Sequence, residues 1–173
     1  MTTHAVTVRV AILTISDSVV AGTRVDDSGP ALQKRCEELG WPVTAAAAVP
    51  DEADAIADRL RQWADAGVAS LILTTGGTGI APRDVTPEAT RAVVEREIPG
   101  LPELMRAEGL KQTIYSSLSR AVVGTRGRSL IVNLPGSPKG AVFSLEAIAS
   151  LVPHAANLLI GNTAHFSNEC ETE

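Results

Sequence analysis

Short apolar runs alternate with longer amphipathic segments along most of the chain. The runs are rich in Val, Ile, Leu and Ala, as buried strands are, and the longer segments repeat apolar residues at helical spacing. The pattern predicts strands at residues 6–15, 41–49, 69–75, 121–124 and 129–134. It predicts helices at residues 28–39, 50–67, 86–97, 99–111 and 141–159, with a Ser-rich loop at 113–120.

This alternation of strand and helix predicts an α/β fold with a mostly parallel sheet and helices on both faces. A chain of 173 residues is about the size of one domain. We therefore expect a single domain over residues 1–160 and a flexible tail at 161–173. Ligands of such folds bind at the carboxyl ends of the strands, which directs attention to segments 16–17, 76–84 and 135–139.

The third expected strand runs into a glycine-rich segment, TTGGTG at 74–79. Glycines let a ligand come close to main-chain N–H groups, which suits phosphate. The segment is neither a Walker A loop nor a dinucleotide fingerprint, because no Gly-Lys-Ser/Thr follows and position 82 is Pro. The candidate anion-binding residues are Gly76, Gly77, Thr78 and Gly79, with a plain tight turn as the alternative.

Acidic residues border the same expected edge of the sheet. Asp17 follows the first strand, Asp51 follows the second, and Asp84 follows the glycine-rich segment. Asp51 also suits a helix N-cap and Asp17 a simple turn, so both roles stay open for each. Carboxylates around a phosphate would repel it unless a divalent cation lies between them, and Mg²⁺ prefers carboxylate and phosphate oxygens. Together with Arg83, these acids point to metal-assisted phosphoryl or nucleotidyl transfer.

Two further polar segments are candidates for ligand binding. Ser119 and Arg120 offer a hydroxyl and a guanidinium, which suit a phosphate-bearing ligand. Pro135, Gly136 and Ser137 follow the last expected strand, where proline stiffens the loop. An ordinary polar loop and a rigid turn are the respective alternatives.

Composition excludes several classes of function. A net charge of −5 and only 3% aromatic residues argue against nucleic-acid binding. The chain has no signal-peptide pattern and no apolar stretch near the ~20 residues that span a bilayer, so we expect a cytoplasmic protein without a membrane partner. Cys36 and Cys170 lack metal-ligand spacing and are expected to be free thiols. His4, His154 and His165 lie outside the candidate loops, which argues against a Ser-His-Asp hydrolase and against zinc.

Taken in order, these motifs resemble those of the molybdopterin-binding family. The family includes the bacterial Mog-type and MoaB-type proteins and the G domains of gephyrin and its plant counterpart. The matching segments are TISD at 14–17, DSGP at 27–30, VPDE at 49–52, TTGGTG at 74–79, RDVTPEAT at 83–90, LSR at 118–120 and NLPGSP at 133–138. The likeness extends over about residues 8–159, and the ordered set is far more specific than any one motif.

The resemblance implies a three-layer α/β domain, usually a homotrimer, in molybdenum cofactor biosynthesis. It implies that the terminal phosphate of molybdopterin attacks the α-phosphate of ATP, giving adenylated molybdopterin and pyrophosphate, with hand-over to a molybdenum insertase. Asp51 and Asp84 fall on the family's catalytic acids, thought to hold Mg²⁺. The phosphate-holding loop falls on Gly76, Gly77, Thr78 and Gly79, and pocket-lining segments fall on Asp17, Ser119, Pro135, Gly136 and Ser137, with Arg83 beside them.

One departure from the family pattern concerns charge. Many relatives carry two basic residues before the acid at position 84, whereas here Pro82 precedes Arg83, so one phosphate contact has no assigned residue. The alternative to an enzyme is a molybdopterin carrier with little turnover. Asp51 and Asp84 favour the enzyme, because pterin binding alone needs neither acid. A nucleotide-binding domain with another phosphotransfer role is a third reading, and the missing Walker lysine weakens it.

Overall fold

A computed structural model of the protein describes residues 7–162, and these form one six-stranded sheet in the order β2-β1-β3-β6-β5-β4. The strands are β1 (Val10–Ile15), β2 (Val43–Val49), β3 (Leu71–Thr75), β4 (Arg96–Glu97), β5 (Val123–Arg126) and β6 (Ser129–Leu134). β2, β1, β3 and β6 run parallel, whereas β5 and β4 are antiparallel to their neighbours. The predicted α/β fold with a mostly parallel sheet is confirmed.

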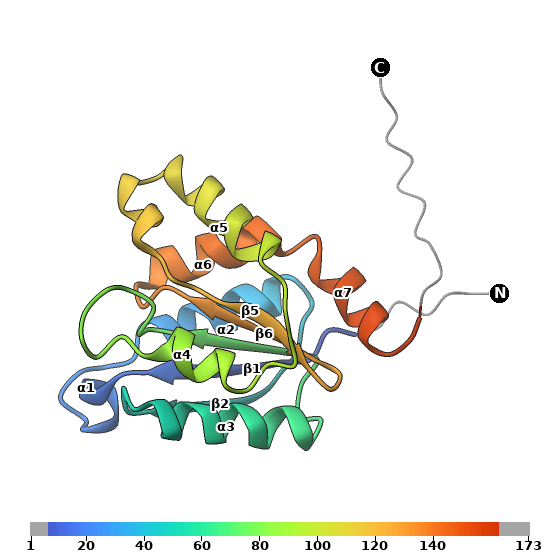
Figure 1. Ribbon diagram of the computed structural model, residues 1–173, viewed down its shortest axis with the longest axis horizontal. Helices are drawn as coiled ribbons and strands as arrows, with labels where there is room; N and C mark the ends of the chain where they lie inside the picture. The colour runs from blue at the N-terminus through green and yellow to red at the C-terminus, as the bar shows by residue number, and fades with distance from the viewer. Residues whose placement is uncertain (1–6, 163–173) are drawn as a thin grey trace.

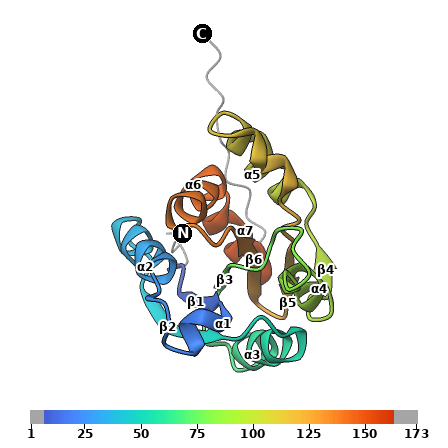
Figure 2. The same cartoon turned by 90° about the vertical axis from the view of Figure 1, so that its left-hand side faces the viewer.

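Helices cover both faces of the sheet (Figures 1 and 2). They are α1 (Asp17–Val20), α2 (Ser28–Glu38), α3 (Ala53–Asp65), α4 (Thr86–Arg91), α5 (Gly100–Leu110), α6 (Pro138–Ile148) and α7 (Val152–Leu159), with a 3₁₀ helix η1 at Ile114–Leu118. Figure 2 shows α2 and α6 on one side of the sheet and α3 and α4 on the other. The three-layer arrangement implied by the family resemblance is therefore present.

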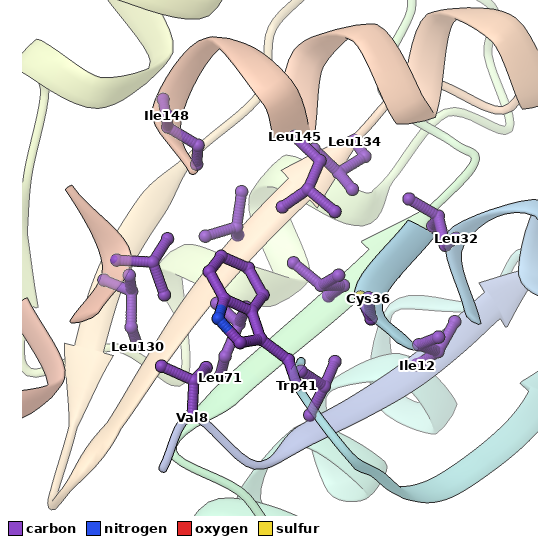
Figure 3. Packing of buried hydrophobic residues seen from close by; sticks show 14 of the residues in the cluster. Val8, Ile12, Leu32, Cys36, Trp41, Leu71, Leu130, Leu134, Leu145 and Ile148 are labelled. Carbon is purple, nitrogen blue, oxygen red and sulfur yellow. The ribbon is translucent and has the colours of Figure 1, made fainter. Parts of the chain in front are cut away.

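Each face of the sheet has its own hydrophobic core. Side chains of β1, β3 and β6 point to α2, α6 and α7 on one face, where Trp41, Leu71 and Leu145 pack together (Figure 3). On the other face, Ile56 and Leu60 of α3 pack against the same three strands. β1 and β3 are buried along their whole length, which explains why their sequences are continuously apolar.

The helix expected at residues 86–97 was predicted too long. α4 ends at Arg91, and the chain then joins the edge of the sheet, where the Glu95 amide donates to Thr125 O at 2.7 Å and the Ile98 amide donates to Val123 O at 2.8 Å. β-branched residues precede this pairing and favour extended structure over helix. The strand at 121–124 is β5, shifted to Val123–Arg126.

The helix expected at residues 141–159 is two helices. α6 ends at Ile148 and α7 begins at Val152, because Pro153 has no N–H to continue the hydrogen-bond ladder. Among the described residues no single helix is long and apolar enough to cross a membrane, and only α6 and α7 together, bent by 65°, would pass that test. The expected tail from residue 163 onward, and Cys170, lie outside the described residues.

Candidate functional site

The carboxyl ends of β1, β2, β3 and β6 meet at one edge of the sheet, as parallel pairing requires. The loop after β3 and the short helix α1 lie together at this edge, at the left of Figure 1. The candidate loops identified from sequence therefore come from four strands and converge, as the rule for open α/β sheets predicts.

The glycine loop after β3 takes a conformation that only glycine adopts readily. Gly76 has φ 109° and Gly77 has φ 64°. A side chain at Gly76 would collide with the carbonyl oxygen of Ile15, and one at Gly77 would collide with the hydroxyl of Thr86. That hydroxyl donates to Gly76 O at 2.9 Å. The N-cap of α4 is Val85, so Thr86 anchors the loop rather than capping that helix.

The main-chain N–H groups of this loop are available to a ligand. Within residues 7–162, the amides of Gly77, Thr78 and Gly79 have no hydrogen-bond acceptor, although Thr78 is only 6% exposed. Successive amides without acceptors in a glycine-rich turn form a concave site that suits an anion. This geometry favours the anion-binding interpretation over a plain tight turn.

Arg120 holds the far side of this loop in place. Its guanidinium donates to Gly79 O at 2.6 Å and to Asp84 O at 2.5 Å, and it forms an ion pair with Glu88. Burial raises the pKa of Glu88, but the hydrogen bond and charge of Arg120 and its own backbone bring that pKa below the ordinary 4.5. Arg120 thus stabilises the loop rather than presenting its guanidinium to a ligand, contrary to the sequence-based hypothesis.

Asp84 closes the loop from within. Its Oδ2 accepts from the Ala81 amide at 2.8 Å, and a side chain at Gly79 would lie 2.8 Å from that same oxygen. Asp84 Oδ1 has no partner in the described part of the chain. The carboxylate is therefore oriented by one oxygen and free to bind through the other.

Asp17 and Asp51 form a reciprocal pair across the ends of β1 and β2. The Asp17 amide donates to Asp51 Oδ2 at 2.8 Å, and the Asp51 amide donates to Asp17 Oδ1 at 3.0 Å. Asp17 Oδ2 also pairs with Arg83 at 2.6 Å. The N-cap of α3 is Glu52, so Asp51 does not cap that helix. Its Oδ1 lies 3.5 Å from the Cβ position of Gly77, beside the glycine loop.

The proline-containing loop after β6 packs directly on the glycine loop. Thr75 Oγ1 donates to Pro135 O at 2.7 Å, and a Cβ at Gly136 would lie 3.3 Å from Gly76 Cα. Ser137 caps α6, accepting from the Gly140 amide at 3.2 Å. The positive end of the α6 dipole thus faces the same edge of the sheet as the glycine loop.

A cleft of about 600 Å³ opens between these loops, α5, η1 and α6. The candidate residues that line it are Gly77, Thr78, Gly79, Asp84, Ser119, Pro135, Gly136 and Ser137. Asp17, Asp51, Gly76 and Arg83 do not line it. Asp51 instead lies beside Gly77, which does line the cleft, and Arg83 is paired with Asp17.

Sequence reasoning missed the apolar wall of the cleft, which consists of Met105, Tyr115, Leu118 and Phe143. Met105 on α5 and Phe143 on α6 lie in stretches that read as ordinary core, whereas Tyr115 and Leu118 lie on η1. Tyr115 did carry a signal, because it is the single tyrosine of the chain and stands in a Ser-rich segment. It is 75% exposed, so its ring is accessible to a ligand in the cleft.

The acids at this edge fit Mg²⁺ only in company with a phosphate ligand. In residues 7–162 no three His, Cys, Asp or Glu side chains gather as a metal-binding group. Mg²⁺ is commonly held by one or two carboxylates together with substrate phosphates and water. Asp51 beside Gly77 and Asp84 beside Gly79 provide that number of carboxylates, next to amides that suit phosphate.

The lining of the cleft therefore has two chemically different parts. Free amides, a carboxylate and the α6 N-terminus suit a phosphate group with its cation. The Tyr115 and Phe143 rings suit a flat heterocycle. A molecule that joins a heterocycle to a phosphate group therefore matches both parts of the lining.

Comparison with known proteins points the same way. Residues 11–154 match the family model described as a probable molybdopterin binding domain. A Helicobacter pylori protein named molybdopterin adenylyltransferase is 40% identical over 158 residues, covering 90% of each chain. The Drosophila molybdenum cofactor synthesis protein cinnamon is 46% identical over 149 residues, which cover 86% of this chain but a quarter (25%) of that protein.

A solved structure agrees with the fold. The molybdopterin biosynthesis enzyme MoaB from Thermus thermophilus superposes with a TM-score of 0.84 at 52% identity, covering 89% of this chain and 97% of that one. The family match spans most of the chain and contains every loop of the site described above. This protein belongs to the molybdopterin-binding domain family of molybdenum cofactor biosynthesis.

Proposed function

We propose that this protein is a molybdopterin adenylyltransferase, which transfers AMP from ATP to molybdopterin and releases pyrophosphate. The observation that carries the proposal is that free amides of the glycine loop and an apolar wall with two aromatic rings line one and the same cleft. The 40% identity to a relative of that name over 90% of both chains supports it.

The reaction places modest chemical demands on the protein. The terminal phosphate of molybdopterin is the nucleophile, so no activated Ser, Cys or His is needed, and pyrophosphate leaves from the α-phosphate of ATP. The amides of Gly77, Thr78 and Gly79 would bind and orient phosphate oxygens and stabilise the charge that develops on them. The hydroxyls of Ser119 and Ser137 line the same cleft and would orient the ligands further.

Both substrates are anionic, so we include Mg²⁺ in the proposal. Asp51 and Asp84 would hold it, and when bound it would neutralise phosphate charge. The Asp17 carboxylate accepts from the Asp51 amide and pairs with Arg83, so both residues would act by positioning Asp51 rather than by contacting substrate.

The proposal extends to the state of the protein in the cell. We expect a cytoplasmic homotrimer that passes adenylated molybdopterin to a molybdenum insertase. Sedimentation equilibrium of the full chain would measure the oligomeric state directly, and a monomer at micromolar concentration would contradict this part.

The decisive experiment is a turnover assay. Purified protein is mixed with molybdopterin and ATP, with Mg²⁺ or with EDTA, and adenylated molybdopterin is measured with pyrophosphate release as a check. Product that requires molybdopterin and Mg²⁺ supports the enzyme. Tight pterin binding without product would identify a carrier, and no pterin binding would overturn the proposal.

A further inference from the structure

The charged groups lining the cleft are few within the described residues. They are Asp84, Arg106 and Lys139. Lys139 is exposed, whereas Arg106 is half-buried in the wall formed by α5. The cleft therefore holds one partly desolvated cation, and desolvation strengthens its interaction with an anion.

Arg106 has no carboxylate partner in the described part of the chain. Its hydrogen bond is a long one, from Nη1 to Ser119 O at 3.4 Å. Arg83, by contrast, pairs with Asp17 at 2.6 Å, and Arg120 makes three contacts with the loop at 79–84 and with Glu88. Most of the five donors of the Arg106 guanidinium thus remain free to bind a ligand.

A second cavity shows what surrounds the far side of this guanidinium. Its volume is about 310 Å³, and Arg91, Arg106 and Arg120 all line it. Glu97 forms an ion pair with Arg91, and Glu88 forms one with Arg120. Arg106 lines both cavities, and of these three arginines it is the one without an ion pair in residues 7–162. Partial burial makes an unpaired cation less favourable, and within residues 7–162 no carboxylate forms an ion pair with Arg106.

The glycine loop itself brings no cation into the cleft. Position 82 is Pro, and Arg83 is committed to Asp17 outside the cleft lining. A phosphate seated on the loop amides would therefore meet the negative charge of Asp84 without a positive side chain from the same loop. Arg106 brings a cation into the same cleft from a different element, α5.

We propose that Arg106 binds a phosphate group of a ligand in the cleft that the glycine loop also lines. A guanidinium matches two phosphate oxygens at once, which an ammonium cannot do. The inference rests on the proposed function for the ligand's identity. Phosphate could come from the ATP triphosphate or from molybdopterin, and the test separates these sources.

The test compares Arg106→Ala, Arg106→Lys and the control Arg128→Ala. Arg128 is exposed in the turn before β6, at the other edge of the sheet, so its removal changes net charge equally without touching the cleft. Kd for ATP by calorimetry, Kd for molybdopterin by fluorescence titration, and kcat and KM are measured at two ionic strengths. Melting temperatures establish that each variant is folded.

Arg106→Ala should weaken one phosphate ligand by about 10-fold to 100-fold, as expected for losing charge-assisted hydrogen bonds. Arg106→Lys should recover only part of the affinity, and the defect should shrink at high salt. The ligand that weakens identifies the phosphate source. Arg128→Ala should bind both ligands as the unchanged protein does.

Equal affinities in Arg106→Ala and the unchanged protein, or equal losses in Arg106→Ala and Arg128→Ala, would overturn the inference. A fall in kcat or melting temperature with unchanged Kd would overturn it too. Failure of the proposed function would give a different result from failure of this inference. The unchanged protein would then make no adenylated product, while ATP binding would still report on Arg106.

Discussion

At the scale of single residues, the glycine loop is defined by close approaches of backbone to backbone. Gly76 sits against the end of β1 with φ 109°, and Gly136 packs on Gly76 in turn. No other residue type could occupy position 76 without both a strained backbone and a collision. This is why the loops after β1, β3 and β6 can share one small volume.

Gly76→Ala should therefore cost about 3 kcal/mol or more in the free energy of unfolding, the sum of a positive-φ penalty and overpacking. Gly40 is a matched control, because it has φ 75° but nothing lies within 4 Å of its Cβ position. Gly40→Ala should cost only about 1 kcal/mol. Urea unfolding of both variants measures the difference, and equal costs would mean that the contact with Ile15 is not rigid.

Asp84 offers a second test at this scale. Asn keeps an oxygen that can accept from the Ala81 amide, so Asp84→Asn should preserve the turn while removing the charge. We expect turnover to fall by at least about 100-fold, with an unchanged melting temperature, since the carboxylate is proposed to hold a cation rather than the fold. Near-normal turnover in the folded variant would remove Asp84 from the catalytic site.

The residue scale is also where sequence reasoning was least complete. The motifs pointed to Asp84, Gly77, Gly79 and Ser137 as neighbours, and all four line one cleft. They did not reveal that Asp17 and Asp51 bind each other's backbone, because that contact joins positions 34 residues apart. Arg106 and Phe143 carry no local signal, since in a helix an arginine reads as a surface residue and a phenylalanine as a core residue until the packing is known.

At the scale of elements, α3 and β5 are tied by one ion pair. Arg126 Nε donates to Asp65 Oδ1 at 2.8 Å and Nη2 to Oδ2 at 3.0 Å. The hydrogen bonds from Arg126, followed by its charge, hold the pKa of Asp65 below the ordinary value of 3.8. The stabilisation is therefore present above about pH 3.8 and is lost as pH falls through the lower pKa of the folded state.

Asp65→Asn should accordingly be less stable than the unchanged protein at pH 7, and the gap should close in strongly acidic solution. Thermal unfolding from pH 7 down to pH 3 measures this. Asp58→Asn is the control on the same helix, because its pair with Arg61 lies within α3 and joins no second element. A gap that stays constant down to pH 3 would contradict the role given to Asp65.

The ends of helices and strands are less well predicted by local sequence patterns than their order is. Strand and helix order followed from periodicity, since buried parallel strands are continuously apolar. The end of α4 did not follow from periodicity, because the chain leaves the helix to pair with β5. The position of β5 is set by its pairing with β6, which is distant in sequence from residue 91. The break before α7 was readable in principle from Pro153, a residue that cannot continue a helix.

At the scale of the whole molecule, the core on the α2–α6 side isolates Cys36 from water. Its side chain is fully buried beside Trp41 and Leu32 (Figure 3), and burial, with a smaller contribution from Glu37, raises the pKa of the thiol to about 12. Only the thiolate attacks disulfide reagents, so reaction requires the molecule to open.

In a Cys170→Ser variant, Cys36 is the single thiol, and it should react with Ellman's reagent about a thousand-fold more slowly than free cysteine at pH 8. The rate should rise to that of free cysteine in unfolding concentrations of urea. A fast reaction of the folded protein would mean that α2 separates from the sheet without global unfolding.

The strand order has a consequence for how the chain is made. β6 lies beside β3, yet Thr75 and Pro135, which hydrogen-bond at the site, are 60 residues apart. A ribosome adding about 5–20 residues per second takes roughly 3 to 12 seconds to pass between them. During that interval the apolar β3 has one unpaired edge, which neighbouring nascent chains on the same messenger could also pair with. Because β6 pairs with β3, its synthesis both completes the support of the glycine loop and covers the unpaired edge of β3.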